Sequence, residues 1–403
     1  MDYVSIPIDM LAIGKPLPVD IWNPSGQLLL RRGQLVVSEQ HREKLHAFQA
    51  STTATDAQAW QRSYERMVHA MLRDGVDLKT IAQAPMPSNI LQRDYIVSEH
   101  INGGWLDLQE VLRGILYQGG LAINPLQRLT NIETKVLKLL QEDPDDSLFL
   151  LFQALPDLNL GYCATHALLC AAICELTAQK LALDSTQRQS LLRAALTMNI
   201  GMARDQDSFA RQKTAPSDAQ RERIRQHPQR SVDILQSFDV GDFDQIDIVQ
   251  WHHEPDSPLG FPGNLMSRRL LSLADTFVAK MATRETRAPI SPVQAVKSMI
   301  VGATGNTVEL GSAMAQAVGF YPPGSYVQLV TGEIAVSARR GTRANTPWVI
   351  GILDKKGMPV SRYTPYNTAE PAYAIHKPVS YQHVRVIVNA EKVRRALNRL
   401  PGF

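Results

Sequence analysis

Five side chains in the middle of the sequence are of types that could together hold divalent metal ions. Four are histidines and the fifth is an acid in the apolar run LLSLAD: His166, His227, His252, His253 and Asp275. Imidazole nitrogens and carboxylate oxygens are the usual ligands of Fe, Mn, Zn and similar ions. Two such ions can generate hydroxide at neutral pH and bind a phosphodiester between them. The residue types therefore favour a hydrolytic metal centre.

Each of these residues also has a purely structural interpretation. A lone histidine on an apolar helix is more often a packed or surface residue than a ligand. Asp275, an acid in an apolar run, needs a partner, which could be a helix N-terminus or a basic side chain instead of a metal. Neighbours on a helix diverge by about 100°, so His252 and His253 reach one cluster only if the helix frays there or two metals share the site.

The elements expected to position these side chains are mostly helices. From about residue 104 to 302 the apolar periodicity is helical, with no alternation of strands and helices. The clearest helical segments begin at Trp105, Leu126, Tyr162, Ser185, Asp218, Phe243, Leu265 and Pro292. The pattern predicts a helical bundle whose centre can receive ligands from several helices.

Small β elements are expected on both sides of this helical block. The turn signal at 23–26 lies between two apolar runs, and Ser38 is a candidate N-cap for the helix that follows. After about residue 320, two strand-turn-strand patterns are centred on 331–332 and 356–357. The prediction is a mainly α protein with three parts: an accessory region over 1–100, a helical domain over 101–320 and a β-rich extension over 321–403.

Composition narrows the class of protein further. The chain has 403 residues, a hydrophobic fraction of 44% and a net charge of +3, which gives no reason to expect binding to nucleic acid or to a membrane surface. No apolar run is long enough to span a bilayer and no signal peptide is visible, so we expect a cytoplasmic protein. Cys163, Cys170 and Cys174 fall in one apolar segment, which favours buried free thiols over a disulfide, metal or redox pair.

The order and spacing of the motifs resemble those of the HD-GYP domain, the branch of the HD phosphohydrolases that hydrolyses cyclic di-GMP. THALLCAAICELTAQKLAL is similar to the family's first histidine helix and QRERIRQHPQRSVDIL to its second histidine segment. HHEPDSPLGFP resembles HHExxDGxGYP, and LLSLADTFVAKMATRETR resembles the last metal-binding helix. The resemblance implies that the five residues above bind Fe, Mn or another divalent metal. It also implies that Arg284, Arg287 and Phe261 contact the nucleotide.

The sequence departs from this family at the residues that give the family its name. Met198 and Asn199 replace the His-Asp dyad, and Met202 replaces the lysine after it. In the family that Asp bridges two metals, whereas Asn offers only a neutral carbonyl and Met a soft thioether. Tyr162 stands where members with a third metal carry a glutamate. These changes predict a metal centre without its bridging carboxylate.

Two functions compete on this basis. The first is a degenerate HD-GYP-like regulatory protein in bacterial cyclic di-GMP signalling, catalytically weak or inactive, that binds the nucleotide or a protein partner. The alternative is an active metal-dependent phosphodiesterase that uses a reduced ligand set. An HDOD-type module, which has a similar helical core, is disfavoured because it has no need of the HHE…GFP segment. A homodimer stays open.

Overall fold

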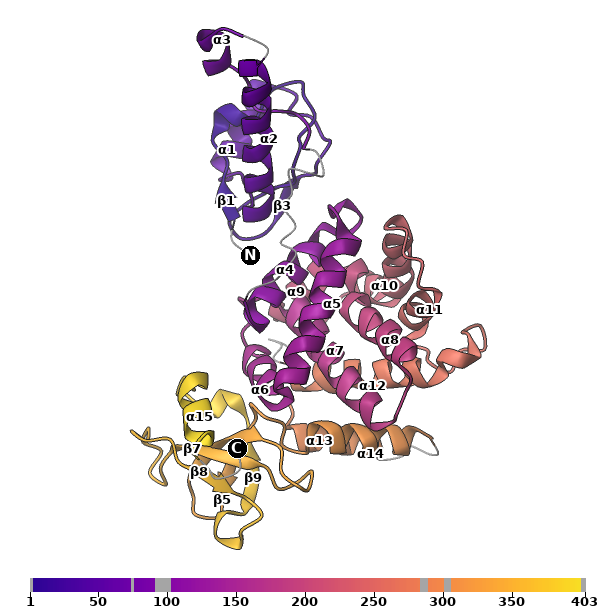
Figure 1. The fold of residues 1–403 in the computed structure, drawn as a ribbon, viewed down its shortest axis with the longest axis vertical. Coiled ribbons are helices and arrows are strands. Elements are labelled where there is room, and N and C mark those ends of the chain that lie inside the picture. The colour runs from indigo at the N-terminus through magenta and orange to yellow at the C-terminus, as the bar shows by residue number, and fades with distance from the viewer. Residues whose placement is uncertain (1–2, 74–75, 91–102, 283–288, 301–305, 400–403) are drawn as a thin grey trace. The chain divides into compact units, whose positions relative to one another are not determined.

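The computed structural model describes residues 3–73, 76–90, 103–282, 289–300 and 306–399 (Figure 1). It contains two compact units, residues 1–99 with 121–128 and residues 100–120 with 129–403. Helices dominate from residue 105 to residue 318, and a small sheet lies toward each terminus. The predicted fold class, mainly α with β-containing ends, is confirmed. In the described ranges no helix combines the length and the apolar character needed to cross a membrane.

The first unit is a short sheet with helices. Its strands are ordered β1-β4-β2-β3 and span Tyr3–Ser5, Ser51–Thr53, Ile21–Trp22 and Leu28–Leu30. The predicted turn joins β2 to β3, with Gly26 at φ +82. The predicted cap is also present, since Ser38 accepts a 3.2 Å hydrogen bond from the His41 backbone. The helices of this unit are α1 (Glu39–Ala47), α2 (Ala54–Arg73) and α3 (Leu78–Ala82).

The helical block of the second unit follows the predicted segments closely. Its helices are α4 (Trp105–Gln118), α5 (Pro125–Glu142), α6 (Pro144–Ala154), α7 (Tyr162–Lys180), α8 (Ser185–Thr197), α9 (Ala203–Arg211), α10 (Asp218–Ser237), α11 (Phe243–Trp251), α12 (Leu265–Met281), α13 (Pro292–Ile300) and α14 (Asn306–Val318). Every predicted start agrees to within one residue. Helices α6, α9 and α14 were not among the predicted segments.

Helix α7 is the central element of this block. Every residue from Tyr162 to Ala178 is buried, as expected for a helix that is apolar on all sides. Its alanines, cysteines and threonines are small, so α4, α6, α8, α9, α12 and α14 can all pack directly against it. A polar side chain on α7 therefore lies in the centre of the bundle, which is where His166 is placed.

The C-terminal part is a five-stranded antiparallel sheet with a final helix. The strand order is β8-β7-β6-β5-β9, with bounds Pro365–Asn367, Trp348–Leu353, Ile334–Arg339, Tyr326–Leu329 and Ile375–Val379, followed by α15 (Ala390–Leu397). The predicted hairpin around 331–332 joins β5 to β6. The second predicted hairpin is incomplete: after the turn at 356–357 only one bridge, Leu353 to Pro359, forms, and β7 pairs with β8 instead.

This sheet is attached to α6. Phe149 of α6 packs in one apolar cluster with residues of β6, β7 and α15. Around that cluster the acidic start of α6 pairs with arginines of the C-terminal part: Asp143 with Arg339, Asp145 with Arg340 and Asp146 with Arg394. Charge-assisted contacts around an apolar centre fix the sheet against the helical block.

Candidate metal centre

A proline sets the orientation of His227. Helix α10 begins with a capping box at Ser217 and Gln220 and contains Pro228 directly after the histidine. Proline has no N–H, so the carbonyl four residues earlier, at Ile224, loses its helical donor. The His227 Nδ1 contacts that carbonyl instead. Because a carbonyl can only accept, Nδ1 carries the proton and Nε2 presents a lone pair.

The end of α11 does the same for His252. The helix stops at Trp251, so carbonyls of its last turn lack helical partners. His252 Nδ1 lies 2.7 Å from the carbonyl of Val249 and donates its proton there. Its Nε2 is therefore also an acceptor. The end of the helix at this point also satisfies the condition under which His252 and His253 reach a common cluster.

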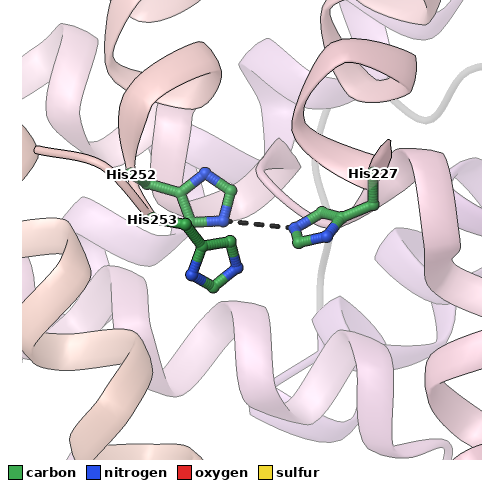
Figure 2. A group of neighbouring side chains, drawn as sticks. All are labelled: His227, His252 and His253. Carbon is green, nitrogen blue, oxygen red and sulfur yellow. Dashed lines mark hydrogen bonds between the residues drawn. The ribbon is translucent and has the colours of Figure 1, made fainter. Parts of the chain in front are cut away.

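The two lone pairs point at each other. Figure 2 shows the pair, with the Nε2 atoms of His227 and His252 3.2 Å apart. Both rings are fully buried. Burial, with the neighbouring histidines second, lowers the pKa of His227 to about 3 and that of His252 to about 4. A proton between the nitrogens is therefore disfavoured near neutral pH.

A divalent cation fits this arrangement. Two nitrogens on one tetrahedral Zn²⁺, each at about 2.0–2.1 Å, lie roughly 3.3 Å apart, close to the observed 3.2 Å. The exposed His253 completes the group, with ligand atoms of all three histidines within 4.8 Å of one another. Its ring centroid is 4.2 Å from that of His252 and 5.0 Å from that of His227. These three residues would hold a metal ion.

A second group lies around His166 on α7. His166 Nε2 is 2.7 Å from a carboxylate oxygen of Asp275 on α12, and its Nδ1 is 3.0 Å from the Tyr162 hydroxyl. Burial alone would raise the pKa of Asp275, but the hydrogen bond from His166 and the nearby His252 hold it well below its ordinary value. Cys170 Sγ joins the group at 3.5 Å from His166 Nε2. Ligand atoms of His166, Cys170 and Asp275 also lie within 4.8 Å of one another.

The positions of the family dyad are buried beside α10. Met198 is fully buried, and both amide atoms of the buried Asn199 lack a hydrogen-bond partner among the described residues. The short helix η4 (Ile200–Met202) follows, with Met202 half-buried. A Cβ on Gly201 would lie 2.7 Å from the His227 carbonyl oxygen, so only glycine allows this close approach. Ser231 of α10 fixes it by donating to the Met198 carbonyl at 2.7 Å.

The GFP segment is held by a buried arginine. Arg268 of α12 donates to the carbonyls of Pro255 and Phe261 and pairs with Asp247 at 2.8 Å. A Cβ on Gly260 would fall 2.2 Å from that guanidinium, so the glycine makes room for it. The Phe261 side chain is 61% exposed, so it is available to a ligand and does not pack in the core.

Some of these residues carried no clear sequence signal. Arg268 lies seven residues before Asp275, two helical turns along the same face, and that spacing could have placed it inward. Cys170 lies one turn after His166, but a cysteine in an apolar segment is typical of buried packing. Arg284 and Arg287 lie outside the described residues.

Comparisons with known proteins give one family match for the helical block. The family model described as HD domain matches residues 151–305. The chain is also similar to the solved structure of Bd1817, an HDG"Y"P protein from Bdellovibrio bacteriovorus, at 17% identity and a TM-score of 0.40, over 78% of this chain and 98% of that one. No curated protein matches the sequence significantly. The HD-domain match spans His166, His227, His252, His253 and Asp275.

Proposed function

We propose that this chain, whose residues 151–305 match the HD domain and whose motifs resemble those of the HD-GYP type, is a regulatory receptor of cyclic di-GMP signalling with weak or no hydrolytic activity. The HD phosphohydrolase family supplies the substrate class. The proposal places the protein in the cytoplasm, where it would pass the nucleotide signal to protein partners.

One observation carries this proposal. The two positions that would hold the His-Asp dyad carry Met198 and Asn199, both buried against the frame that places His227. Neither side chain brings a negative charge to offset two divalent cations. The frame itself is kept, through Gly201 and Ser231. A scaffold with neutral dyad positions supports recognition better than two-metal hydrolysis.

The remaining donors support metal binding at this site. His227, His252 and His253 would hold one ion, and its charge would attract a phosphate group. The three-histidine set suits Fe, Mn or Zn. The chain's own contribution is to fix both buried imidazoles by their Nδ1 contacts, so that their Nε2 atoms stay directed at one point.

A groove beside His253 supports an anionic, aromatic ligand. It has a volume of about 490 Å³ and lies between α10 and α11. Its lining includes the guanidinium groups of Arg221 and Arg225, the indole of Trp251 and the exposed His253. Guanidinium groups bind phosphates and indoles stack on bases, so this surface suits a nucleotide.

Titration calorimetry with cyclic di-GMP, with and without Mn²⁺, tests the receptor function. We expect saturable binding by the full chain, with little linear dinucleotide formed over hours by chromatography. Restoring the dyad in M198H/N199D should raise hydrolysis while the wild type stays slow. No binding under either condition would eliminate the receptor function.

The alternative is an active phosphodiesterase with a reduced ligand set. The facing nitrogens of His227 and His252 favour it, because they are arranged as a working metal site would require. Rapid hydrolysis by metal-loaded wild type, lost in His252→Ala, would establish this alternative. Such a result would also show that the family dyad is dispensable in this chain.

A further inference from the structure

We propose that Cys170 is a metal ligand, and that with His166 and Asp275 it forms a second, thiolate-containing position selective for a thiophilic ion such as Zn²⁺. This inference rests on the metal-binding part of the proposed function. It assigns a role to a thiol that the sequence alone favoured as simple packing.

The distances fit such a position. A tetrahedral zinc with Zn–S of about 2.3 Å and Zn–N of about 2.0–2.1 Å places its sulfur and nitrogen roughly 3.5 Å apart. Cys170 Sγ and His166 Nε2 are 3.5 Å apart. His166 and Asp275 are closer, at 2.7 Å, because they are hydrogen-bonded to each other. Their ligand atoms would separate by roughly half an ångström to admit the ion.

The helices fix the positions of these three side chains. Cys170 follows His166 by four residues on α7, so both side chains lie on one face of the helix. Asp275 reaches them from α12, which packs against α7. Both α7 residues are essentially inaccessible to solvent, which favours a pre-formed site over chance surface contact.

The charge of the site gives an independent reason to assign Cys170 as a ligand. Asn199 brings no charge to offset divalent ions, and Asp275 is the one acid of this group among the described residues. A Cys170 thiolate would restore one negative charge. It would do so with a soft ligand, which favours Zn²⁺ or Co²⁺ over Mn²⁺.

Protons balance in a simple way. Cys170 loses its thiol proton to solvent as the metal–sulfur bond forms. His166 keeps one proton, which moves from Nε2 to Nδ1. There the Nδ1–H would donate a hydrogen bond to the Tyr162 hydroxyl oxygen, which lies 3.0 Å away. One proton is therefore released for each ion bound at this position.

Cobalt binding to the reduced, metal-stripped full chain tests this assignment. Wild type titrated with Co²⁺ should develop a sulfur-to-cobalt charge-transfer band in the near ultraviolet, in addition to d–d bands. The matched controls are the other two buried thiols. C163S and C174S should keep the charge-transfer band, and C170S should lose it while retaining d–d bands from the three histidines.

A second experiment keeps Cys170 in place, so its result does not depend on the folding of the C170S variant. In the C163S/C174S chain loaded with Zn²⁺, X-ray absorption should show a sulfur neighbour at about 2.3 Å. Only nitrogen and oxygen neighbours, or cobalt d–d bands without charge transfer, would overturn the thiolate assignment. The nucleotide-binding proposal would survive that result, since calorimetry tests it separately.

Discussion

The facing imidazoles make the stability of the metal-free protein depend on pH in a defined way. His227 and His252 have folded-state pKa values of about 3 and about 4, below the ordinary value of about 6.5 expected when the chain unfolds. The unfolded state therefore binds more protons. Stability contributed by these groups is fully present above pH 6.5 and is lost as pH falls from there toward pH 3–4.

The size of the loss in stability depends on the two pH values compared. Between pH 6.5 and 5.0 the folded rings stay neutral while the unfolded rings gain protons. Each histidine then costs about 1.6 kcal/mol, because half of the unfolded rings are already protonated at pH 6.5. Both together give about 3 kcal/mol, or a fall in Tm of about 6–12 °C for a large unit. Asp275, with its lowered pKa, titrates below this window.

The assay compares wild type with H227Q/H252Q by thermal denaturation at pH 6.5, 5.8 and 5.0, with chelator present. The chain has two compact units, so the informative transition is the one that the substitutions shift. Its Tm should fall steeply with pH in wild type and much less in the variant. Saturating Zn²⁺ should raise the wild-type Tm at pH 6.5. Equal pH slopes in the two proteins would refute the argument that these rings are held neutral.

The remaining predictions concern the frame and the ligand. Gly201→Ala should destabilise the protein by about 1–3 kcal/mol in urea denaturation, because its Cβ would meet the backbone of α10 at 2.6–2.7 Å. The control Gly241→Ala, with open space around that glycine, should leave the stability nearly unchanged. Asp207→Asn should cost about 1–3 kcal/mol, since the buried carboxylate accepts a 2.6 Å bond from the first turn of α7; an unchanged midpoint would contradict this. Arg284→Ala and Arg287→Ala should each weaken cyclic di-GMP binding by calorimetry without changing Tm.

Much of the fold was predictable because its signals are local. Helix starts such as those of α8 and α10 depend on a cap, here Asp184 and Ser217, followed by apolar periodicity. Helix α6 packs against α7 and β6, and α9 packs against α7, contacts that no local pattern reports, although α6 also begins with the Asp143 cap followed by Pro144. The second C-terminal hairpin failed for the same reason: strand pairing is decided across the sheet.

The candidate site was also predictable only in part. The sequence supplied the five ligand candidates but not their division into a three-histidine group and a His166 group. That division depends on where α11 ends and on how α12 faces α7. The three-part division of the chain and the roles of the individual site residues stay predictions.

The geometry of His227 and His252 bears on whether this site still binds a metal ion. Two buried acceptors 3.2 Å apart repel each other. Each is nevertheless held by its own device, a proline in α10 and the last turn of α11. A site that had lost all ligands would gain stability by replacing either ring with an apolar side chain. His227 and His252 are both fully buried, with their Nε2 atoms directed at each other, which supports a cation between them as the reason for this arrangement.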